Sequence, residues 1–226
     1  MAESHNSIID NQLVNHAQQR LLDAAEELFA EHGFEASSIR EITKKAQCNL
    51  AAVNYHFHSK ENLYNEVFRR RLAALRDLRI DSINKVMTQK EPQPALEQLL
   101  RAFSTAFLEP LLDQTSGQRF MKLMVREMSD PHLPTKMFVE VLAGPTFTEL
   151  GKGLAIVCPG LSEQKIVLSI ISTIGQLIHV IQLNEMLKMT EFVGVPIPSL
   201  EEMVEHIVEF SAAGIRAASE ENGKKI

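Results

Sequence analysis

Tryptophan is absent from this chain of 226 residues, and only 10 glycines and 9 prolines interrupt it. This scarcity excludes collagen-like and low-complexity chains, which are rich in glycine and proline. Apolar residues make up 45% and charged residues 23% of the sequence, as in ordinary globular domains. Because strong helix formers are plentiful and β-branched runs are few, we predict an all-α fold with a hydrophobic core.

Metal-binding and catalytic motifs are also missing from the sequence. The two cysteines, Cys48 and Cys158, lie far apart and match no zinc-binding or CxxC spacing. The eight histidines include no H-x-x-x-H pair, and there is no catalytic triad, phosphate loop or paired acidic motif. We therefore expect no metal, no cofactor and no enzymatic activity.

A secretory or membrane-spanning segment is not expected either. The N-terminus, MAESHNSIIDNQ, is polar and lacks the apolar stretch of a signal peptide. The longest apolar stretch, residues 165–188, is broken by six polar residues between positions 169 and 182, which a membrane span tolerates poorly. These are Ser169, Ser172, Thr173, Gln176, His179 and Gln182. We predict a cytoplasmic protein with no membrane partner.

The net charge of −6 argues against a nucleic-acid partner, but the charge is unevenly placed. Residues 13–80 hold 10 Lys+Arg against 9 Asp+Glu, a net charge of +1, and the remainder holds 13 against 20, or −7. The acidic excess therefore lies outside the N-terminal segment, which stays available for a polyanion.

Helix signals in the N-terminal segment predict two short helices joined by a tight turn. Gly33 ends a first helix, and Ser38 with Glu41 fits the capping box that opens the next. Asn49 is placed to cap the second short helix, and Ser59 opens a long one. Two short helices in this arrangement form a helix-turn-helix.

The rest of the chain is predicted as helices near 94–113, 116–129, 133–157, 162–189 and 199–218, with the third split near Gly144-Pro145. We divide the chain into a disordered arm (1–12), a helix-turn-helix domain (13–60), a connecting helix (61–88), a ligand-binding and dimerisation domain (89–218) and a tail (219–226).

The helix near 162–189 carries two apolar lines. One line is Val167, Ile171, Ile174 and Ile178, and the other is Ile170, Leu177 and Ile181. A helix with two apolar faces must be covered on more than one side. The cover is either the chain's own core or a second copy, and we expect a homodimer through the helices near 162–189 and 199–218.

The second short helix, in the stretch CNLAAVNYHFHSKENLY, combines small residues with polar aromatics. A helix that reads the major groove must be slim and must offer hydrogen-bonding groups to base edges. Ala51 keeps it slim, and the Asn54 amide suits adenine. Tyr55, His56 and Lys60 can reach phosphate oxygens. This mixture predicts binding to double-stranded DNA.

Residues 20–68, RLLDAAEELFAEHGFEASSIREITKKAQCNLAAVNYHFHSKENLYNEVF, closely resemble the N-terminal domain of TetR-type transcriptional regulators. The resemblance implies a homodimer on a near-palindromic operator and a C-terminal domain that binds a small effector. By position it implies DNA contacts at Ser37, Asn49, Leu50, Ala51, Asn54, Tyr55, His56 and Lys60. The chain departs from the family pattern at Gln47, where glycine is usual in the turn, and at Leu50, where lysine or a small polar residue is common.

An effector pocket would be apolar with a few polar groups that orient the ligand. Its candidates are Phe103, Phe107, Arg119, Phe120, Met124, Arg126, Phe138, Gln176 and His179. Any one of the apolar residues could equally be plain core. We predict a ligand-responsive dimeric regulator, a repressor that an unknown small molecule releases from DNA; the alternative is an architectural DNA-binding protein without a ligand.

Overall fold

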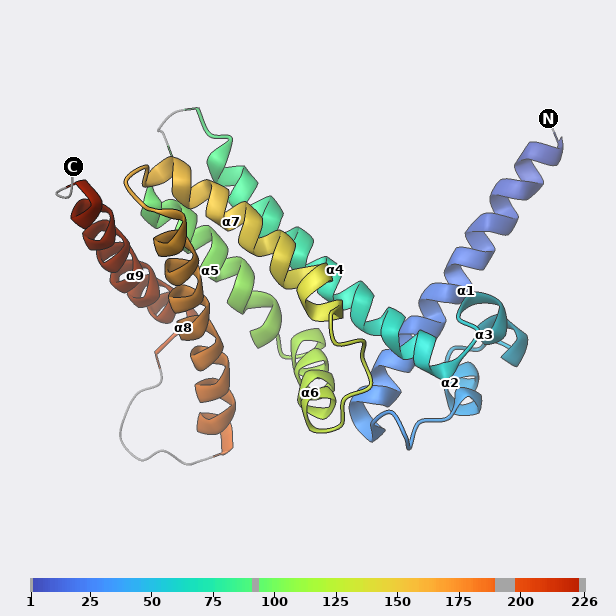
Figure 1. Ribbon diagram of the computed structural model, residues 1–226. Helices are drawn as coiled ribbons and strands as arrows, with labels where there is room; N and C mark the ends of the chain where they lie inside the picture. Colours follow the sequence, from blue (N-terminus) through green and yellow to red (C-terminus); the bar gives the residue numbers. More distant parts are fainter. Residues whose placement is uncertain (1, 91–93, 190–197, 224–226) are drawn as a thin grey trace. The chain divides into compact units, whose positions relative to one another are not determined.

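The computed structural model describes residues 2–90, 94–189 and 198–223, and all of its regular elements in these ranges are helices (Figure 1). They are α1 (Ala2–His32), α2 (Ile39–Lys45), α3 (Leu50–His56), α4 (Lys60–Met87), α5 (Leu96–Leu112), α6 (Ser116–Ser129), the π-helix η1 (Val139–Ala143), α7 (Gly144–Val157), α8 (Glu163–Met189) and α9 (Leu200–Gly223). The predicted all-α fold is confirmed.

The chain forms two compact units. The N-terminal unit comprises Met1–Leu72 and Gln114–Met137, and the C-terminal unit comprises Ala73–Asp113 and Phe138–Ile226. This division differs from the predicted one, which assigned all of 89–218 to a single domain. The α6 segment instead packs on α1, so it belongs to the unit that holds the helix-turn-helix.

The two ends of the chain also differ from the prediction. Residues 1–12 were expected as a disordered arm, yet α1 begins at Ala2. The first turns contain neither glycine nor proline, so the helix has no local signal to stop there. At the other end α9 continues to Gly223, and the last three residues of the predicted tail lie outside the described residues.

The helix boundaries of the N-terminal unit are set by local hydrogen bonds. Gly33 ends α1 in the left-handed region, with φ +85°. The Ser38 hydroxyl accepts from the Glu41 amide, and the Glu41 carboxylate accepts from the Ser38 amide at 3.0 Å, which completes the capping box. At α4, the Asn62 amide donates to the Ser59 hydroxyl at 3.1 Å. The predicted caps at these positions are confirmed.

A buried ion pair joins α1 to the first part of α4. Glu26 is only 1% exposed, and both of its carboxylate oxygens accept from arginines. The Arg70 guanidinium donates at 3.0 Å and Arg71 Nε at 2.8 Å, while Arg71 Nη2 reaches the second oxygen. A buried carboxylate is tolerated when it is fully paired in this way.

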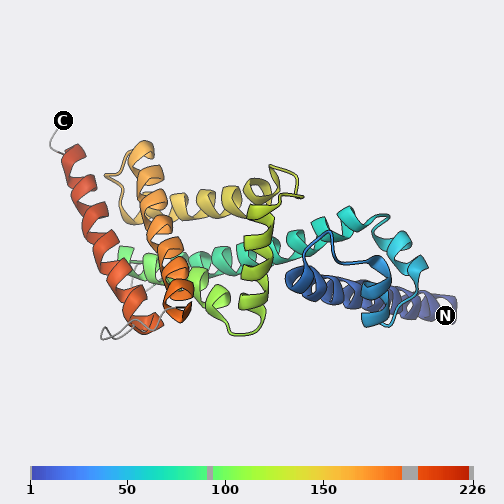
Figure 2. The same ribbon diagram turned by 90° about the horizontal axis from the view of Figure 1, so that it is seen from below.

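The C-terminal unit consists of the second part of α4 with α5, η1, α7, α8 and α9. In it, α5 contacts α7, α8 and α9, and α8 and α9 lie side by side (Figures 1 and 2). Near Gly144-Pro145, where we predicted a split, the π-helix η1 gives way to α7. A Cβ at Gly144 would lie 3.1 Å from the Val139 carbonyl oxygen, so this close turn favours glycine.

The two apolar lines of α8 face different surroundings within the C-terminal unit. Ile170, Leu177 and Ile181 are buried, at 2%, 0% and 6% exposure. On the other line, Val167 and Ile171 are about half exposed. The α8 helix is therefore covered on one side by its own chain and left apolar on the other.

Candidate DNA interface and effector site

The second helix of the helix-turn-helix, α3, is fixed at both ends. Asn49 accepts the Ala52 amide on its side-chain oxygen at 2.9 Å, which confirms the predicted cap. On the inner side, Val53 and Phe57 are buried at 1% and 3% exposure. Two apolar anchors one turn apart hold the helix against the N-terminal unit and leave its other side free.

The free side of α3 carries the side chains predicted to read DNA. Leu50 is 51% and Tyr55 70% exposed, and Ala51 and Asn54 are exposed as well. These residues are spaced i, i+1, i+4 and i+5, so they share one arc of the helix. The arc therefore presents an apolar edge, a methyl group, an amide and a phenol.

The turn that precedes α3 contains backbone strain. Gln47 adopts φ +52°, the left-handed region that favours glycine. Its amide donates to the Lys44 carbonyl at 3.2 Å, and the next amide, of Cys48, donates to the Thr43 carbonyl at 2.9 Å. A side chain in this region costs about 1–2 kcal/mol. The departure from glycine noted in the sequence thus has a conformational cost.

The family resemblance implied that Ser37 faces DNA, but the structure places its side chain in the interior. It is 1% exposed, and its hydroxyl donates to the Gly33 carbonyl at 2.7 Å and to the Leu28 carbonyl at 3.1 Å. The side chain therefore closes the end of α1. Ser37 is buried and its hydroxyl already donates inside the fold, so the side chain is not available to DNA.

Lys60 and His56 lie at the edges of the α3 surface. The Lys60 ammonium lies 4.3 Å from the centroid of the Phe34 ring and 3.4 Å from the Glu35 carbonyl oxygen. The His56 ring meets Tyr55 edge-on, with centroids 5.0 Å apart. His56 also borders a shallow polar hollow lined by Gln18, Phe57, His58, Asn62 and Glu66. Both side chains are partly exposed, as phosphate contacts require.

Two exposed cations on α2, Arg40 and Lys44, were not among the predicted DNA contacts. The neighbouring Lys45 differs, because its ammonium pairs with Glu27 at 2.6 Å. The signal was present in the sequence IREITKK, where basic residues flank the buried Ile42 and Thr43. In a helix-turn-helix, the first helix crosses the DNA backbone, so cations there suit phosphate.

Four of the predicted effector residues belong to the N-terminal unit: Arg119, Phe120, Met124 and Arg126. Arg126 Nε donates to the Ala30 carbonyl at 3.0 Å, and Nη2 to the Glu31 carbonyl at 2.7 Å. The guanidinium thus binds the last carbonyls of α1, a common use of arginine at a helix end. Phe120 is buried against Phe68, with ring centroids 6.1 Å apart.

A second link between α6 and the helix-turn-helix centres on the Glu127 carboxylate. It accepts from the Tyr64 hydroxyl at 3.0 Å and from the amides of His132 and Leu133 at 2.9 and 2.8 Å. Burial, with the Glu127 charge second, raises the pKa of Tyr64 far above its ordinary value. The phenol is therefore a permanent donor, and α6 is held to the start of α4.

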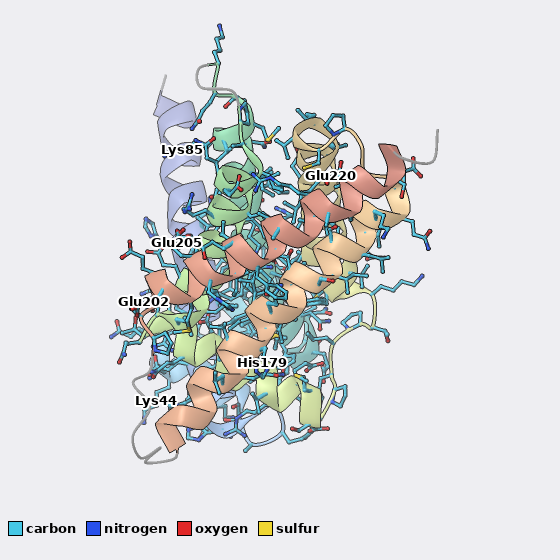
Figure 3. All side chains as sticks on the ribbon, turned by 90° about the vertical axis from the view of Figure 1, so that its left-hand side faces the viewer. Lys44, Lys85, His179, Glu202, Glu205 and Glu220 are labelled. Carbon is cyan, nitrogen blue, oxygen red and sulfur yellow. The ribbon has the colours of Figure 1, made fainter. Side chains whose placement is uncertain are left out.

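The other predicted effector residues lie in the C-terminal unit and are not gathered at one place. Phe103 and Phe107 are buried together, with ring centroids 5.9 Å apart. Phe138 is 46% exposed, and His179 is exposed on α8 (Figure 3). The Gln176 amide donates to the Ser211 hydroxyl at 3.1 Å. Only the phenylalanine pair lies in the interior.

Arg79 is an interior residue that was not among the predicted effector residues. It is 5% exposed, its guanidinium carbon lies 3.9 Å from the centroid of Phe107, and its Nε has no hydrogen-bond partner. Burial alone lowers the pKa of Arg79 to about 10, so the group remains charged at neutral pH. Stacking on an aromatic ring stabilises the charge by about 2 kcal/mol, which is less than the several kcal/mol of desolvation free energy that burying it costs.

The sequence did contain a signal for Arg79. It occupies the core-facing stripe of α4, between Leu72 and Leu75 on one side and Ile83 and Val86 on the other. All four of these apolar residues are buried. A charged residue at an interior position of an apolar stripe is rare unless it is paired.

Two family models match the chain. "Bacterial regulatory proteins, tetR family" matches residues 21–67, and "Tetracyclin repressor-like, C-terminal domain" matches residues 101–214. The first covers the helix-turn-helix and the start of α4. The second covers half of the chain, including most of the C-terminal unit.

Individual relatives agree with these models. The chain is 32% identical over 57 residues to the HTH-type transcriptional repressor AcnR of Corynebacterium diphtheriae, a match that spans 25% of this chain and 30% of the relative's length. A TetR-family regulator of Mesorhizobium loti MAFF303099 has a similar structure, with a TM-score of 0.66 at 18% identity over 90% of this chain and 96% of that one. A TetR-like transcriptional regulator of Rhodococcus sp. RHA1 has a TM-score of 0.59 at 16% identity over 88% and 96%.

These structural relatives share the fold, and the family models extend the likeness to the sequence of both units. The exposed arc of α3, on a capped helix-turn-helix, lies inside the first matched segment. This chain belongs to the TetR family of transcriptional regulators.

Proposed function

We propose that the protein is a homodimeric repressor that binds a near-palindromic operator and leaves it when a small effector binds. The exposed arc of α3 is the observation that carries this proposal. Asn54 would bridge an adenine, while Leu50 and Ala51 would contact thymine methyl groups. A leucine at the front of the arc favours an apolar contact there, so the operator should differ from those read by a lysine.

Phosphate contacts would come from the rim of the same surface. Tyr55 and His56 lie at one end of α3, and Lys60 follows at the start of α4. To these we add Arg40 and Lys44, the exposed cations of α2. Such contacts position the protein on the duplex and make its affinity depend on salt, without reading sequence.

A homodimer would use the uncovered apolar side of α8 with α9. Val167, Ile171 and Ile178 are 48%, 52% and 43% exposed, and Phe210 on α9 is 66% exposed. Figure 3 looks onto these two helices and shows no other element of the C-terminal unit in front of them. A Cβ at Gly214 would meet nothing within 4 Å in its own chain, which leaves room for a partner helix.

The same exposed apolar side gives α8 the composition of a membrane span. Residues Glu163–Leu183 have a mean hydropathy of 1.9 and are 22% buried, and only length and composition support a span. A second copy covers the face more simply, because α9 presents Phe210 beside it. A sedimentation mass of twice 25.4 kDa supports the dimer, and a monomer at all concentrations contradicts it.

Release from DNA would follow a shift between two populations of the dimer. Two recognition helices must lie about 34–36 Å apart to enter successive major grooves. An effector that binds better to another spacing would lower the affinity for the operator. The alternative, an architectural protein without an effector, predicts DNA binding that no small molecule changes.

The experiment that tests DNA reading begins with selection of bound fragments from random DNA, followed by anisotropy titration of the selected site. Replacing Asn54 by alanine should reduce the discrimination at particular base pairs by about 1–3 kcal/mol. Replacing Lys60 by alanine should weaken all sequences alike and flatten the dependence on salt. If Asn54→Ala discriminates as the parent does, Asn54 does not contact a base.

A further inference from the structure

The interior of the C-terminal unit contains a cation, Arg79, that has no counter-charge among the described residues. Arg79 is 95% buried by the chain, no carboxylate contributes to its pKa shift, the Phe107 ring faces its guanidinium, and its Nε has no hydrogen-bond partner. Two hydroxyl groups of the same unit, Ser104 Oγ and Thr146 Oγ1, are also buried and have no partner. A bound water could satisfy a hydroxyl, but it would leave the arginine charge uncompensated.

The helix register brings these three groups to one level. The Ser82 hydroxyl donates to the Ala102 carbonyl, and Arg79 lies on Phe107, so α4 and α5 run in opposite directions. Figures 1 and 2 both show α7 running in the same direction as α4. Positions along the axes of α4, α5 and α7 can therefore be compared by counting residues from one point where all three helices meet.

That contact is at Gly153 of α7, where a Cβ would lie 3.0 Å from Leu99 and 3.6 Å from the Met87 sulfur. From this level, Arg79 lies eight residues back along α4, or about 12 Å, and Thr146 lies seven back along α7, or about 10.5 Å. Along α5, which runs the other way, Ser104 lies five residues on, or about 7.5 Å. Measured along the helix axes, the three residues therefore lie within about 4.5 Å of the same height, less than one helical turn.

We infer that Arg79, with Ser104 and Thr146, binds the acidic group of the effector. This inference rests on the proposed function, because it names the chemistry of the ligand that the repressor would sense. A carboxylate or a phosphate monoester supplies both the missing negative charge and acceptors for the two hydroxyls. Phe107, which faces Arg79, and Phe103, which packs on Phe107, are both buried and favour an apolar body on the same ligand.

The test measures binding by calorimetry on the full-length protein at pH 7. The probes are hexanoate and hexyl phosphate, with hexanamide as the matched neutral molecule. The parent should bind at least one anion about tenfold more tightly than the amide, since a hydrogen bond to a charged group contributes about that factor. Whichever anion binds more tightly identifies the acidic group as carboxylate or phosphate.

Variants separate this site from a general attraction of anions to the protein. Arg79→Met should lose about tenfold or more in affinity for the anion and none for the amide. Arg76→Met is the matched control, because Arg76 lies one turn earlier on α4, is 30% exposed and pairs with Asp77. Equal anion binding by Arg79→Met and the parent, or no preference of the parent for either anion over hexanamide, would overturn the inference.

A ligand-free measurement separates a binding role from a structural one. If Arg79 serves a ligand, Arg79→Met removes an unpaired buried charge and should raise the melting temperature by about 2–4 °C. A lower melting temperature than that of the parent would assign Arg79 to the stability of the fold through Phe107, against the inference.

The DNA assay distinguishes failure of this site from failure of the proposed function. If the anion binds through Arg79 but leaves operator affinity unchanged, the anion site stands and effector release is wrong. If the anion releases DNA equally from the parent and from Arg79→Met, release stands and the site is wrong. Release from the parent that Arg79→Met reduces about tenfold supports both.

Discussion

Each of the two units buries a charged residue at helix α4, and the two residues differ in their partners: Glu26 of α1 packs against α4 in the N-terminal unit, and Arg79 lies on α4 in the C-terminal unit. In the N-terminal unit, Arg71 and Arg70 satisfy the buried carboxylate of Glu26. Eight residues after Arg71, in the C-terminal unit, Arg79 is buried with no carboxylate partner in the part of the chain that the structure describes. Helix α4 therefore contributes arginines to a completed ion pair in one unit and carries a buried arginine without a charged partner in the other.

Under the proposed function, this difference follows from the task of each unit. A DNA-binding surface needs a rigid support, and a paired buried charge specifies one arrangement of α1 against α4. A site that responds to a ligand needs an interaction which only the ligand completes. Three of the four buried polar atoms without partners in the described residues lie in the C-terminal unit; the fourth belongs to the half-buried Asn65.

The largest expected effect comes from breaking the completed pair. Glu26→Gln should lower the free energy of unfolding by about 3 kcal/mol, because it leaves Arg71 without a carboxylate partner and Arg70 with only the exposed Asp23. Urea unfolding followed by circular dichroism measures the change. Glu27→Gln is the matched control: its pair with Lys45 is one-third exposed, so its loss should cost less than 1 kcal/mol. Equal effects of the two changes would show that Glu26 contributes no more than a surface pair.

A second comparison uses two serines of the C-terminal unit. The Ser82 hydroxyl donates to the Ala102 carbonyl at 3.0 Å, whereas the fully buried Ser104 hydroxyl has no partner. Ser82→Ala should cost about 1 kcal/mol, and Ser104→Ala should be neutral or stabilise the ligand-free protein by up to about 1 kcal/mol. Thermal unfolding of both variants without ligand measures the difference. A loss at Ser104 as large as that at Ser82 would mean that its hydroxyl is already satisfied in the free protein.

The smallest effect is expected at the strained turn of the N-terminal unit. Gln47→Gly should stabilise the protein by about 0.5–1 kcal/mol, because glycine adopts φ +52° without a Cβ clash. Gln47→Ala is the control, since it removes the side chain but keeps the Cβ and the strain. If both variants gain equally in urea unfolding, the exposed glutamine side chain and not the backbone is responsible.

The helix-turn-helix could be predicted from the sequence because its signals are local. Ser38 with Glu41 and Asn49 form hydrogen bonds within three residues of themselves, so their spacing alone identifies the helix starts. The two lines of α8 were also visible, since periodicity assigns residues to faces. The predicted DNA contacts on α3 remain predictions, although the exposure of Asn54 and Tyr55 suits them.

The parts that could not be predicted depend on contacts between distant segments. Nothing local in α6 indicates that Arg126 binds carbonyls 95 and 96 residues earlier. Ser37 matched the family pattern, but its burial depends on how α1 ends at Gly33. The unpaired state of Arg79 is a property of the whole interior, since a sequence can show a charge in an apolar stripe but not its missing partner.

The attachment of α6 to α1 also limits how such a protein can be recombined. A chimaera that exchanges residues 1–72 would carry the helix-turn-helix away from the segment 114–137. Arg126 would then have to bind the end of a foreign first helix, and Glu127 would lose the Tyr64 hydroxyl unless the new segment supplies one. Residues 1–72 therefore cannot be transferred to another protein as an independent unit. A working graft must transplant two separate stretches of the gene together, and new operator specificity is more readily acquired by changing side chains on α3.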